Sequence, residues 1–410
     1  MAGTSLRRLK LFSFKLNVLL DITQAINENL SQEDLLKRYE SILKSELSIG
    51  SIVIFKYNNK WECILKSGLK DPGIVDRIDV YRDLLSIKEI TNVTTSEDEI
   101  LSHFDVLIPV YNNNAPLAFV LIGDIEEEME GISPTIKHLH FIQTLSNIII
   151  VAIENMRLHN ESIRQESIRK ELELAGQMQS LLIPNPNKLP HSDQVFVSTY
   201  YQPHFEIGGD YYDFLTLNND IVGFCIADVS GKGISAALFM SNFQANLRAL
   251  FTAKVPLEEL IHKLNDRVME IANGEKFITL FIARVDLKTK KLEYINAGHN
   301  PPILYEIGSN KIEYLTEGCI GVGMLDKIPF LIKGKWDIKG RTKILCYTDG
   351  LVEYIHENRV EFDIRELEYA LSNKFGIDEN IEEIIQNQNI YKGNTSIFDD
   401  ISILAIEFFK

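Results

Sequence analysis

Four aspartates stand where a charged side chain is costly. Asp210 follows two glycines in EIGGDYYDF, Asp228 and Asp349 each close an apolar run, and Asp399 precedes the apolar run ISILAIEF together with Asp400. A carboxylate at the tip of a buried strand is partly desolvated and needs a compensating charge. Two interpretations follow, and the local pattern does not choose between them: ligands of a cation, or ordinary turn and capping aspartates.

Carboxylates without an accompanying His or Cys cluster favour magnesium or manganese over zinc. The neighbouring glycines could bring backbone close to an ion or a phosphate, because glycine has no side chain. The segment VSGKG, which contains Gly231, resembles the end of a phosphate-binding loop. However, Lys232 is followed by Gly233, so the motif G-x-x-x-x-G-K-[ST] is not satisfied and a nucleotide-binding loop is excluded.

The composition limits the classes of protein to be considered. A chain of 410 residues with 45% hydrophobic and 24% charged residues predicts two or three globular domains. The formal net charge of -16 argues against nucleic-acid binding, which requires a basic surface. The four cysteines form no C-x-x-C pair, which favours a reducing, cytoplasmic setting over a disulfide framework or a zinc ribbon.

The first zone, residues 10–137, opens with helical periodicity. Ser31 has the position of a helix N-cap with Asp34 three residues later, which predicts a second helix. Strand-like runs follow at 51–57, 61–68, 106–112 and 116–124. Asn113 and Asn114 between the last two runs predict a hairpin turn.

The second zone, residues 138–182, is one long helical stretch. Apolar residues recur at spacings of three and four from Ile142 to Met156 and on to Ile163, and a second seam, out of phase with the first, begins at Ile168. This pattern is typical of a coiled coil and predicts a parallel homodimer. The alternative is a connecting helix packed on one domain. The most apolar run, 145–153, is too short for a membrane span.

The third zone, residues 183–410, follows the proline-rich IPNPNKLP. Strand signals at 224–228, 277–286, 291–298 and 343–349 alternate with helical signals at 235–252 and 256–273. Paired strands and grouped helices indicate the α+β class.

Seven motifs then occur in order: IGGDYYDF, IADVSGKGISAALFM, FITLFIARVD, NAGHNPP, GCIGVGM, YTDGLVE and DDISILAIEF. Together they resemble the metal-dependent serine/threonine protein phosphatases, in the bacterial branch typified by the stage II sporulation E phosphatase, over about residues 170–410. The resemblance implies an αββα sandwich of two antiparallel sheets with a two-metal site at one end. The first zone resembles a GAF sensor domain in its pattern of helices and strands. This implies an unidentified small-molecule or protein signal.

The resemblance also implies roles for individual residues. Asp228 would bridge two divalent cations, manganese or magnesium, with the Val229 carbonyl as a further ligand. Asp349 and Asp399 would hold the second ion, and Asp210 would act through the other ion and its waters. The supporting residues expected around these ligands are Gly209, Gly231, Gly350, His299 and Asp400.

The implied activity is hydrolysis of phosphoserine or phosphothreonine on a partner protein, by analogy an anti-sigma-factor antagonist. Some relatives place a histidine where Ser230 stands, so the proton donor to the leaving group is unassigned. His299 is the nearest candidate by type, although two following prolines favour a structural role. The alternatives are a catalytically silent phosphoprotein-binding scaffold, and a cyclase or histidine kinase behind the same sensor. A kinase would require an ATP lid that does not follow the linker.

Overall fold

The computed structural model describes residues 2–93, 100–112, 115–125, 134–272, 274–356, 359–362, 364–388, 390 and 399–409. The chain divides into two compact units, Met1–Glu166 and Ser167–Lys410. Each unit has its own buried apolar core. The expected division at residues 137 and 182 stays a prediction.

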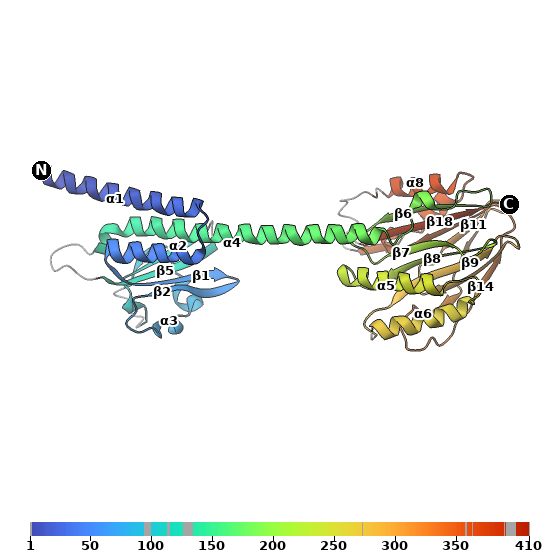
Figure 1. Cartoon of the computed structure of the whole chain (residues 1–410), viewed down its shortest axis with the longest axis horizontal. Helices are drawn as coiled ribbons and strands as arrows, with labels where there is room; N and C mark the ends of the chain where they lie inside the picture. Colours follow the sequence, from blue (N-terminus) through green and yellow to red (C-terminus); the bar gives the residue numbers. More distant parts are fainter. Residues whose placement is uncertain are drawn as a thin grey trace. The chain divides into compact units, whose positions relative to one another are not determined.

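The N-terminal unit is an antiparallel sheet between helices (Figure 1). Its sheet has the order β2-β1-β5-β4-β3. Along β1, Ile52 and Ile54 face one core while Val53 and Phe55 face another, as a strand buried on both faces requires. The strands are β1 (Ile49–Asn58), β2 (Lys60–Ser67), β3 (Thr91–Asn92), β4 (Val106–Asn112) and β5 (Ala115–Ile125).

Helices α1 (Ala2–Asn27) and α2 (Gln32–Ser41) contribute to the same core as Ile52 and Ile54. The predicted cap of α2 is confirmed, because the Ser31 hydroxyl accepts a hydrogen bond from the Asp34 amide at 3.2 Å. The predicted pairing of 106–112 with 116–124 is also confirmed, whereas its turn, Asn113 and Asn114, lies outside the described residues. Shorter elements are η1 (Ile42–Glu46), α3 (Ile74–Arg77), η2 (Val80–Leu84) and η3 (Leu101–His103).

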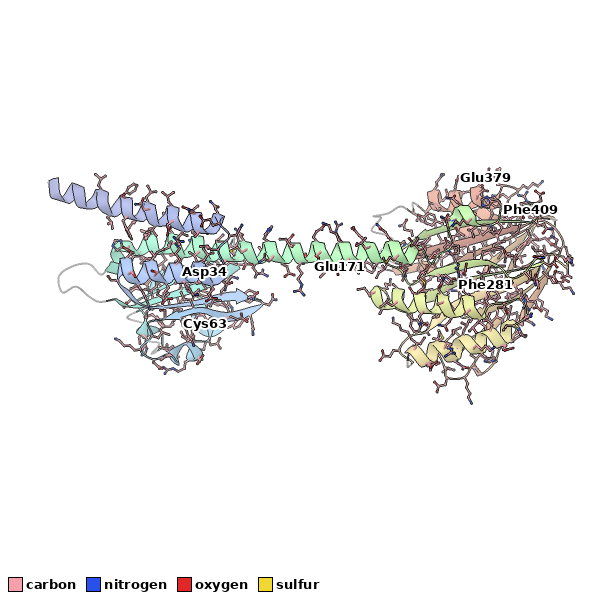
Figure 2. The ribbon with its side chains drawn as sticks, in the orientation of Figure 1. Asp34, Cys63, Glu171, Phe281, Glu379 and Phe409 are labelled. Carbon is pink, nitrogen blue, oxygen red and sulfur yellow. The ribbon has the colours of Figure 1, made fainter. Side chains whose placement is uncertain are left out.

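Helix α4 (Pro134–Ser180) is continuous, as its periodicity predicts. The prediction that the first seam pairs with a second chain is wrong for Ile142, Leu145 and Ile149. These residues are fully buried in the core of their own unit, because the same face of the helix covers the sheet. Residues 157–171, including Glu171 in Figure 2, are all exposed.

By length and composition, α4 passes the test for a membrane span over 138–180, with a mean hydropathy of 1.2 in its most apolar window. Half of that window is buried inside the structure, as in the core helix of a globular domain. It is the one such helix in the described part of the chain.

The C-terminal unit is a four-layer α–β–β–α sandwich (Figure 1). The first sheet has the order β13-β10-β9-β8-β7, with β14 paired to β10, and the second has the order β12-β11-β15-β18-β6. The first sheet contains β7 (Tyr211–Thr216), β8 (Ile221–Val229), β9 (Ile278–Asp286), β10 (Lys291–Ala297), β13 (Gly318–Cys319) and β14 (Gly334–Asp337). The second contains β6 (Val195–Gln202), β11 (Ile303–Glu306), β12 (Lys311–Tyr314), β15 (Thr342–Tyr347) and β18 (Ile401–Phe408).

Alternation along the strands explains the layers. In β15, Ile344 and Cys346 belong to the core shared with the first sheet, whereas Leu345 and Tyr347 face the helices of the outer layer. Phe281 of β9 is fully buried in the shared core (Figure 2). Helices α5 (Ile234–Leu250) and α6 (Leu257–Ala272) cover the first sheet, and α7 (Arg365–Leu371) and α8 (Ile377–Asn387) cover the second. The remaining elements are η4 (Pro186–Lys188), η5 (Asp349–Leu351), β16 (Glu353–His356) and β17 (Arg359–Phe362). The predicted α+β sandwich is confirmed.

Candidate metal centre

Both sheets of the sandwich bring a carboxylate to the same end. Asp210 directly precedes β7 and Asp228 is the last residue but one of β8, in the first sheet. In the second sheet, Asp349 follows β15 after one residue, and Asp399 and Asp400 directly precede β18. The aspartates of the two sheets lie close enough to interact, because the negative charges of Asp349, Asp399 and Asp400 each raise the pKa of Asp228. The structure therefore brings together aspartates up to 190 positions apart.

Burial and mutual repulsion shift the pKa values of these carboxyls upward. Burial raises the pKa of Asp228 to about 8, with further increases from the neighbouring negative charges. Burial also raises the pKa of Asp210 well above its usual range, reinforced by Asp228 and Asp400. The pKa of Asp349 rises to about 6, mainly through burial and then through Asp399. Negative charge at this end of the sandwich is therefore under-compensated.

Asp400 has a supporting position beneath the loop that leads to Asp210. Its Oδ1 accepts a hydrogen bond from the His204 amide at 2.7 Å, and its Oδ2 accepts one from the Gly209 amide at 2.5 Å. Burial raises the pKa of Asp400, while these two amides lower it. Since the His204 and Gly209 amides lie on either side of the loop, one carboxylate fixes both ends of it.

Asp210 is itself held by the second sheet. The Thr348 hydroxyl donates to Asp210 Oδ2 at 2.7 Å, and the Ser402 amide donates to the Thr348 hydroxyl at 2.9 Å. Thr348 is fully buried and Asp210 nearly so. This chain of bonds orients a buried carboxylate, and a buried acceptor left without its donor would cost about 1–3 kcal/mol.

Two ammonium groups lie at the loop after β8: Lys232 belongs to this loop, and Lys276 reaches it from the segment before β9. Lys232 Nζ lies 2.7 Å from Asp399 Oδ2, and both side chains are partly exposed, which places the open edge of the cluster here. Lys276 Nζ donates to the Ser230 carbonyl at 2.8 Å. Gly231 has a φ of 89°, a conformation that favours glycine, so the sharp turn depends on this residue.

Close backbone approaches explain two further glycines. A β-carbon at Gly350 would lie 2.2 Å from the Asp400 carbonyl oxygen, so only glycine lets β15 and β18 converge at the two aspartates. A β-carbon at Gly209 would lie 3.2 Å from the carbonyl oxygen of Val229, which places that carbonyl beside the Asp210 loop.

His299 is buried behind the cluster. A 2.8 Å hydrogen bond joins its Nδ1 to Thr279 Oγ1, and Thr279 is paired with Asp228 across β8 and β9. Burial lowers the pKa of His299 to about 4, so the ring is neutral near pH 7. A neutral, buried ring of this pKa favours the structural interpretation over a proton donor.

The last turns of α4 contact the same loop. Gln179 Nε2 donates to the Gly208 carbonyl at 2.7 Å, and the Gly208 amide donates to Gln179 Oε1 at 3.1 Å. One turn earlier, a β-carbon at Gly176 would lie 2.1 Å from the Glu206 carbonyl oxygen. The helix is therefore packed backbone to backbone on the segment that positions Asp210.

The donors fit hard divalent cations. They are carboxylates and a carbonyl, the oxygen ligands preferred by magnesium and manganese. In the part of the chain that the structure describes, no three His, Cys, Asp or Glu side chains converge closely enough to surround one ion. The cluster has the charge and the chemistry of a cation site, without a closed coordination shell.

Comparison with known proteins agrees with the fold. The family described as Stage II sporulation protein E (SpoIIE) matches residues 218–409. Protein IcfG of Synechocystis sp. is 28% identical over 266 residues, which are 58% of this chain and 41% of that protein. Phosphoserine phosphatase RsbU of Bacillus subtilis is 28% identical over 194 residues, which are 47% of this chain and 57% of that protein. The chain spans about half the length of the curated relatives that it matches.

Among solved structures, the SiaA-PP2C domain of Pseudomonas aeruginosa has a TM-score of 0.51 at 17% identity, over 60% of this chain and 98% of that chain. The two-sheet sandwich thus has the fold of the PP2C-type phosphatase domains. Within that class, residues 218–409 resemble the stage II sporulation E type of domain, as the family match and the relative RsbU indicate. Asp210 precedes the matched segment, so its assignment depends on the geometry described above.

Sequence reasoning missed three supporting residues: Thr348, Gln179 and Lys276. Thr348 adjoins Asp349 in YTDG, which is the one local signal for it. Gln179 is a polar residue in an otherwise apolar seam at 168, 172, 175 and 182, and such an interruption could have indicated a specific contact. Lys276 has no local signal, because its partner is 46 positions away.

Proposed function

We propose that this protein is a divalent-metal-dependent phosphatase that hydrolyses phosphoserine or phosphothreonine on a partner protein. The observation that carries the proposal is the buried carboxylate cluster around Asp228, whose pKa of about 8 reflects negative charge that lacks a counter-charge. The phosphatase family of residues 218–409 and the name of the relative RsbU support the same chemistry.

The cations would be held by Asp228 and the Val229 carbonyl, by Asp349 and Asp399, and by Asp210. When bound, two such ions lower the pKa of a water to give a hydroxide nucleophile and neutralise phosphoryl oxygens. The protein supplies the positioning: Thr348 fixes Asp210, and Asp400 fixes the loop that carries it. Lys232 leaves an ammonium group at the exposed edge, where a phosphate would approach.

The experiment is hydrolysis of p-nitrophenyl phosphate with manganese, with magnesium and with chelator. Asp228→Asn should lose most of the activity, because the variant removes the central carboxylate of the cluster. Asp266→Asn, an exposed aspartate on α6, is the matched control and should retain full activity. Full activity in a folded Asp228→Asn protein would sink the assignment. Binding of a phosphoprotein without hydrolysis would instead favour a silent scaffold.

The substrate we propose is an anti-sigma-factor antagonist phosphorylated on serine. The support is the resemblance to the sporulation-type enzymes and to the phosphoserine phosphatase RsbU. Recognition of such a folded protein depends on its shape. We therefore expect short phosphopeptides to be hydrolysed far less efficiently than the intact phosphoprotein. Equal efficiency on both would contradict this choice of substrate.

The N-terminal unit is proposed to be a GAF-like sensor of an unidentified small molecule or protein, in a cytoplasmic enzyme. The support is the separation of the two units, since all the proposed ligands lie beyond residue 200. Deleting residues 1–166, the whole N-terminal unit, should change the rate or its response to a signal without abolishing hydrolysis. A folded deletion protein that binds no manganese would contradict this separation of roles.

A homodimer remains part of the proposal, but through a different surface from the buried seam. Helix α1 exposes four apolar side chains at spacings of three and four, with exposed fractions of 48–69%: Leu9, Phe12, Leu16 and Leu20. Such a stripe on one helix face suits pairing with the same helix of a second copy. Light scattering should show a dimer that Leu16→Glu converts to a monomer. An unchanged mass would exclude this face.

A further inference from the structure

The loop after β8 holds the Lys232 side chain at the open edge of the carboxylate cluster. A glycine precedes this lysine and another follows it, Gly231 with a φ of 89° and Gly233 with a φ of 75°, a conformation that other residues rarely adopt. The Ser230 carbonyl accepts a 2.8 Å hydrogen bond from Lys276 Nζ, which ties the loop to the segment before β9. The backbone around Lys232 is therefore fixed, whereas the long stem of its side chain can still change direction.

The ammonium group of Lys232 lies against the carboxylates that are proposed to hold one of the cations. Its Nζ is 2.7 Å from Asp399 Oδ2, with exposed side-chain fractions of 47% for Lys232 and 36% for Asp399. Its positive charge also lowers the pKa of Asp349, against the increase that burial causes. The ammonium group thus contacts one of these two carboxylates directly and acts on the other through its charge.

A cation and the ammonium group compete for the same carboxylate. Asp399 Oδ2 is in hydrogen-bond contact with Lys232 Nζ, so a metal ion that binds this oxygen must displace the ammonium group. The displacement costs little, because a partly exposed ion pair is weak, and a divalent ion has twice the charge of the group that it replaces. The displaced ammonium group stays near the cluster, because the backbone of its loop is fixed, and a lysine binds phosphate well as a point charge.

We propose that Lys232 is an internal competitor for the cation at Asp399, which metal binding releases and which then binds the phosphate group of the substrate. The inference rests on the proposed function, from which it takes the cation and the phosphate ester. It implies an order of events in which the metal binds before the phosphate. Because one side chain opposes metal binding and favours phosphate binding, its removal should change the two affinities in opposite directions.

The test measures both affinities in the full chain carrying Lys232→Gln. The dissociation constant for manganese, obtained by titration with electron paramagnetic resonance of the free ion, should fall roughly two- to fivefold, the range expected for loss of an exposed ion pair. At saturating manganese, the KM for p-nitrophenyl phosphate should rise roughly tenfold, as for loss of one charge-assisted hydrogen bond. Lys263→Gln is the matched control, because Lys263 pairs with Glu259 on α6 at the same distance of 2.7 Å and with exposed fractions of 46% and 52%. It should change neither value.

A second measurement follows the ammonium group itself in the unmodified chain. Lysines are acetylated in the presence of magnesium or of chelator, and the modified peptides are quantified by mass spectrometry. Magnesium should raise the acetylation of Lys232 relative to that of Lys263 by roughly two- to fivefold, because the amine is released from its carboxylate while the pair on α6 stays intact. This measurement does not depend on hydrolysis.

Each part of the proposal can fail without the proposed function. A manganese affinity that is unchanged or weaker in a folded Lys232→Gln protein would overturn the competition, and an unchanged KM would overturn the role in phosphate binding. Acetylation of Lys232 that does not increase with magnesium would show that the metal does not displace the ammonium group. Hydrolysis of the ester by the unmodified chain would leave the proposed function standing in all three cases. If the unmodified chain hydrolyses no ester with manganese, the proposed function itself fails.

Discussion

The contact between Gln179 and Gly208 predicts that the end of α4 controls the order of the metal site. In Gln179→Ala, the Gly208 amide and carbonyl lose bonds of 3.1 Å and 2.7 Å in a place where Gln179 is only 7% exposed. A buried polar group without a partner costs about 1–3 kcal/mol, and partial access of water to the gap lowers the total for the two. We expect a loss of about 2 kcal/mol in the stability of the C-terminal unit.

For a domain of this size, about 2 kcal/mol corresponds to a fall in Tm of roughly 4–8 °C. The same change frees the loop that leads to Asp210, so the manganese concentration for half-maximal activity should rise. Calorimetry and manganese titration of the phosphatase rate measure the two effects separately. Gln179→Glu keeps the acceptor for the Gly208 amide but not the donor, and should show a smaller loss of manganese affinity than Gln179→Ala.

Gln177→Ala is the matched control, since Gln177 is exposed two residues away on the same helix. It should change neither Tm nor the manganese requirement. If Gln179→Ala behaves like Gln177→Ala in both measurements, the bonds to Gly208 do not couple the helix to the site and the reasoning is wrong.

Three further predictions concern the same unit and the linker. Burial lowers the pKa of His299 from 6.5 to about 4 in the folded protein, so its contribution to the free energy of unfolding is complete above pH 6.5. As the pH falls toward 4, this contribution is lost, by on the order of 3 kcal/mol. The difference in Tm between pH 7 and pH 5 should therefore be smaller in His299→Gln than in the unmodified protein, and an identical difference would refute a buried neutral ring. Thr348→Val keeps the shape of the side chain but removes the hydroxyl that donates to Asp210, so its metal-dependent rate should fall, whereas Thr348→Ser keeps the hydroxyl and should keep the rate. Equal rates in the two variants would show that the hydroxyl is dispensable. One residue inserted between Asn160 and Glu161 rotates the following helix by about 100°, whereas seven inserted residues nearly restore its phase. The phosphatase rate should therefore change with one inserted residue and recover with seven. A rate that does not depend on the length of the insertion would mean that the linker is a passive tether.

The periodicity of the sequence alone was sufficient to predict the secondary-structure elements and the fold class. Runs such as KILCYTD and ISILAIEF are long enough, apolar enough and bounded sharply enough to predict β15 and β18, and the Ser31 cap marks the start of α2. The positions of Asp228 and Asp349 at strand ends were readable for the same reason. A strand places its last residue at the sheet edge whatever the rest of the chain does.

The tertiary structure decided which surfaces these elements use. The spacing of Ile142, Leu145 and Ile149 is the same whether this face of the helix packs on the sheet of its own unit or on a second helix. Only the folded unit shows that the face packs on the sheet. The Asp400 carboxylate reaches the amides of His204 and Gly209 across more than 190 positions, and Gln179 reaches Gly208 across 29. Such bonds depend on where strands and helices meet in space, and local periodicity carries no information about that meeting.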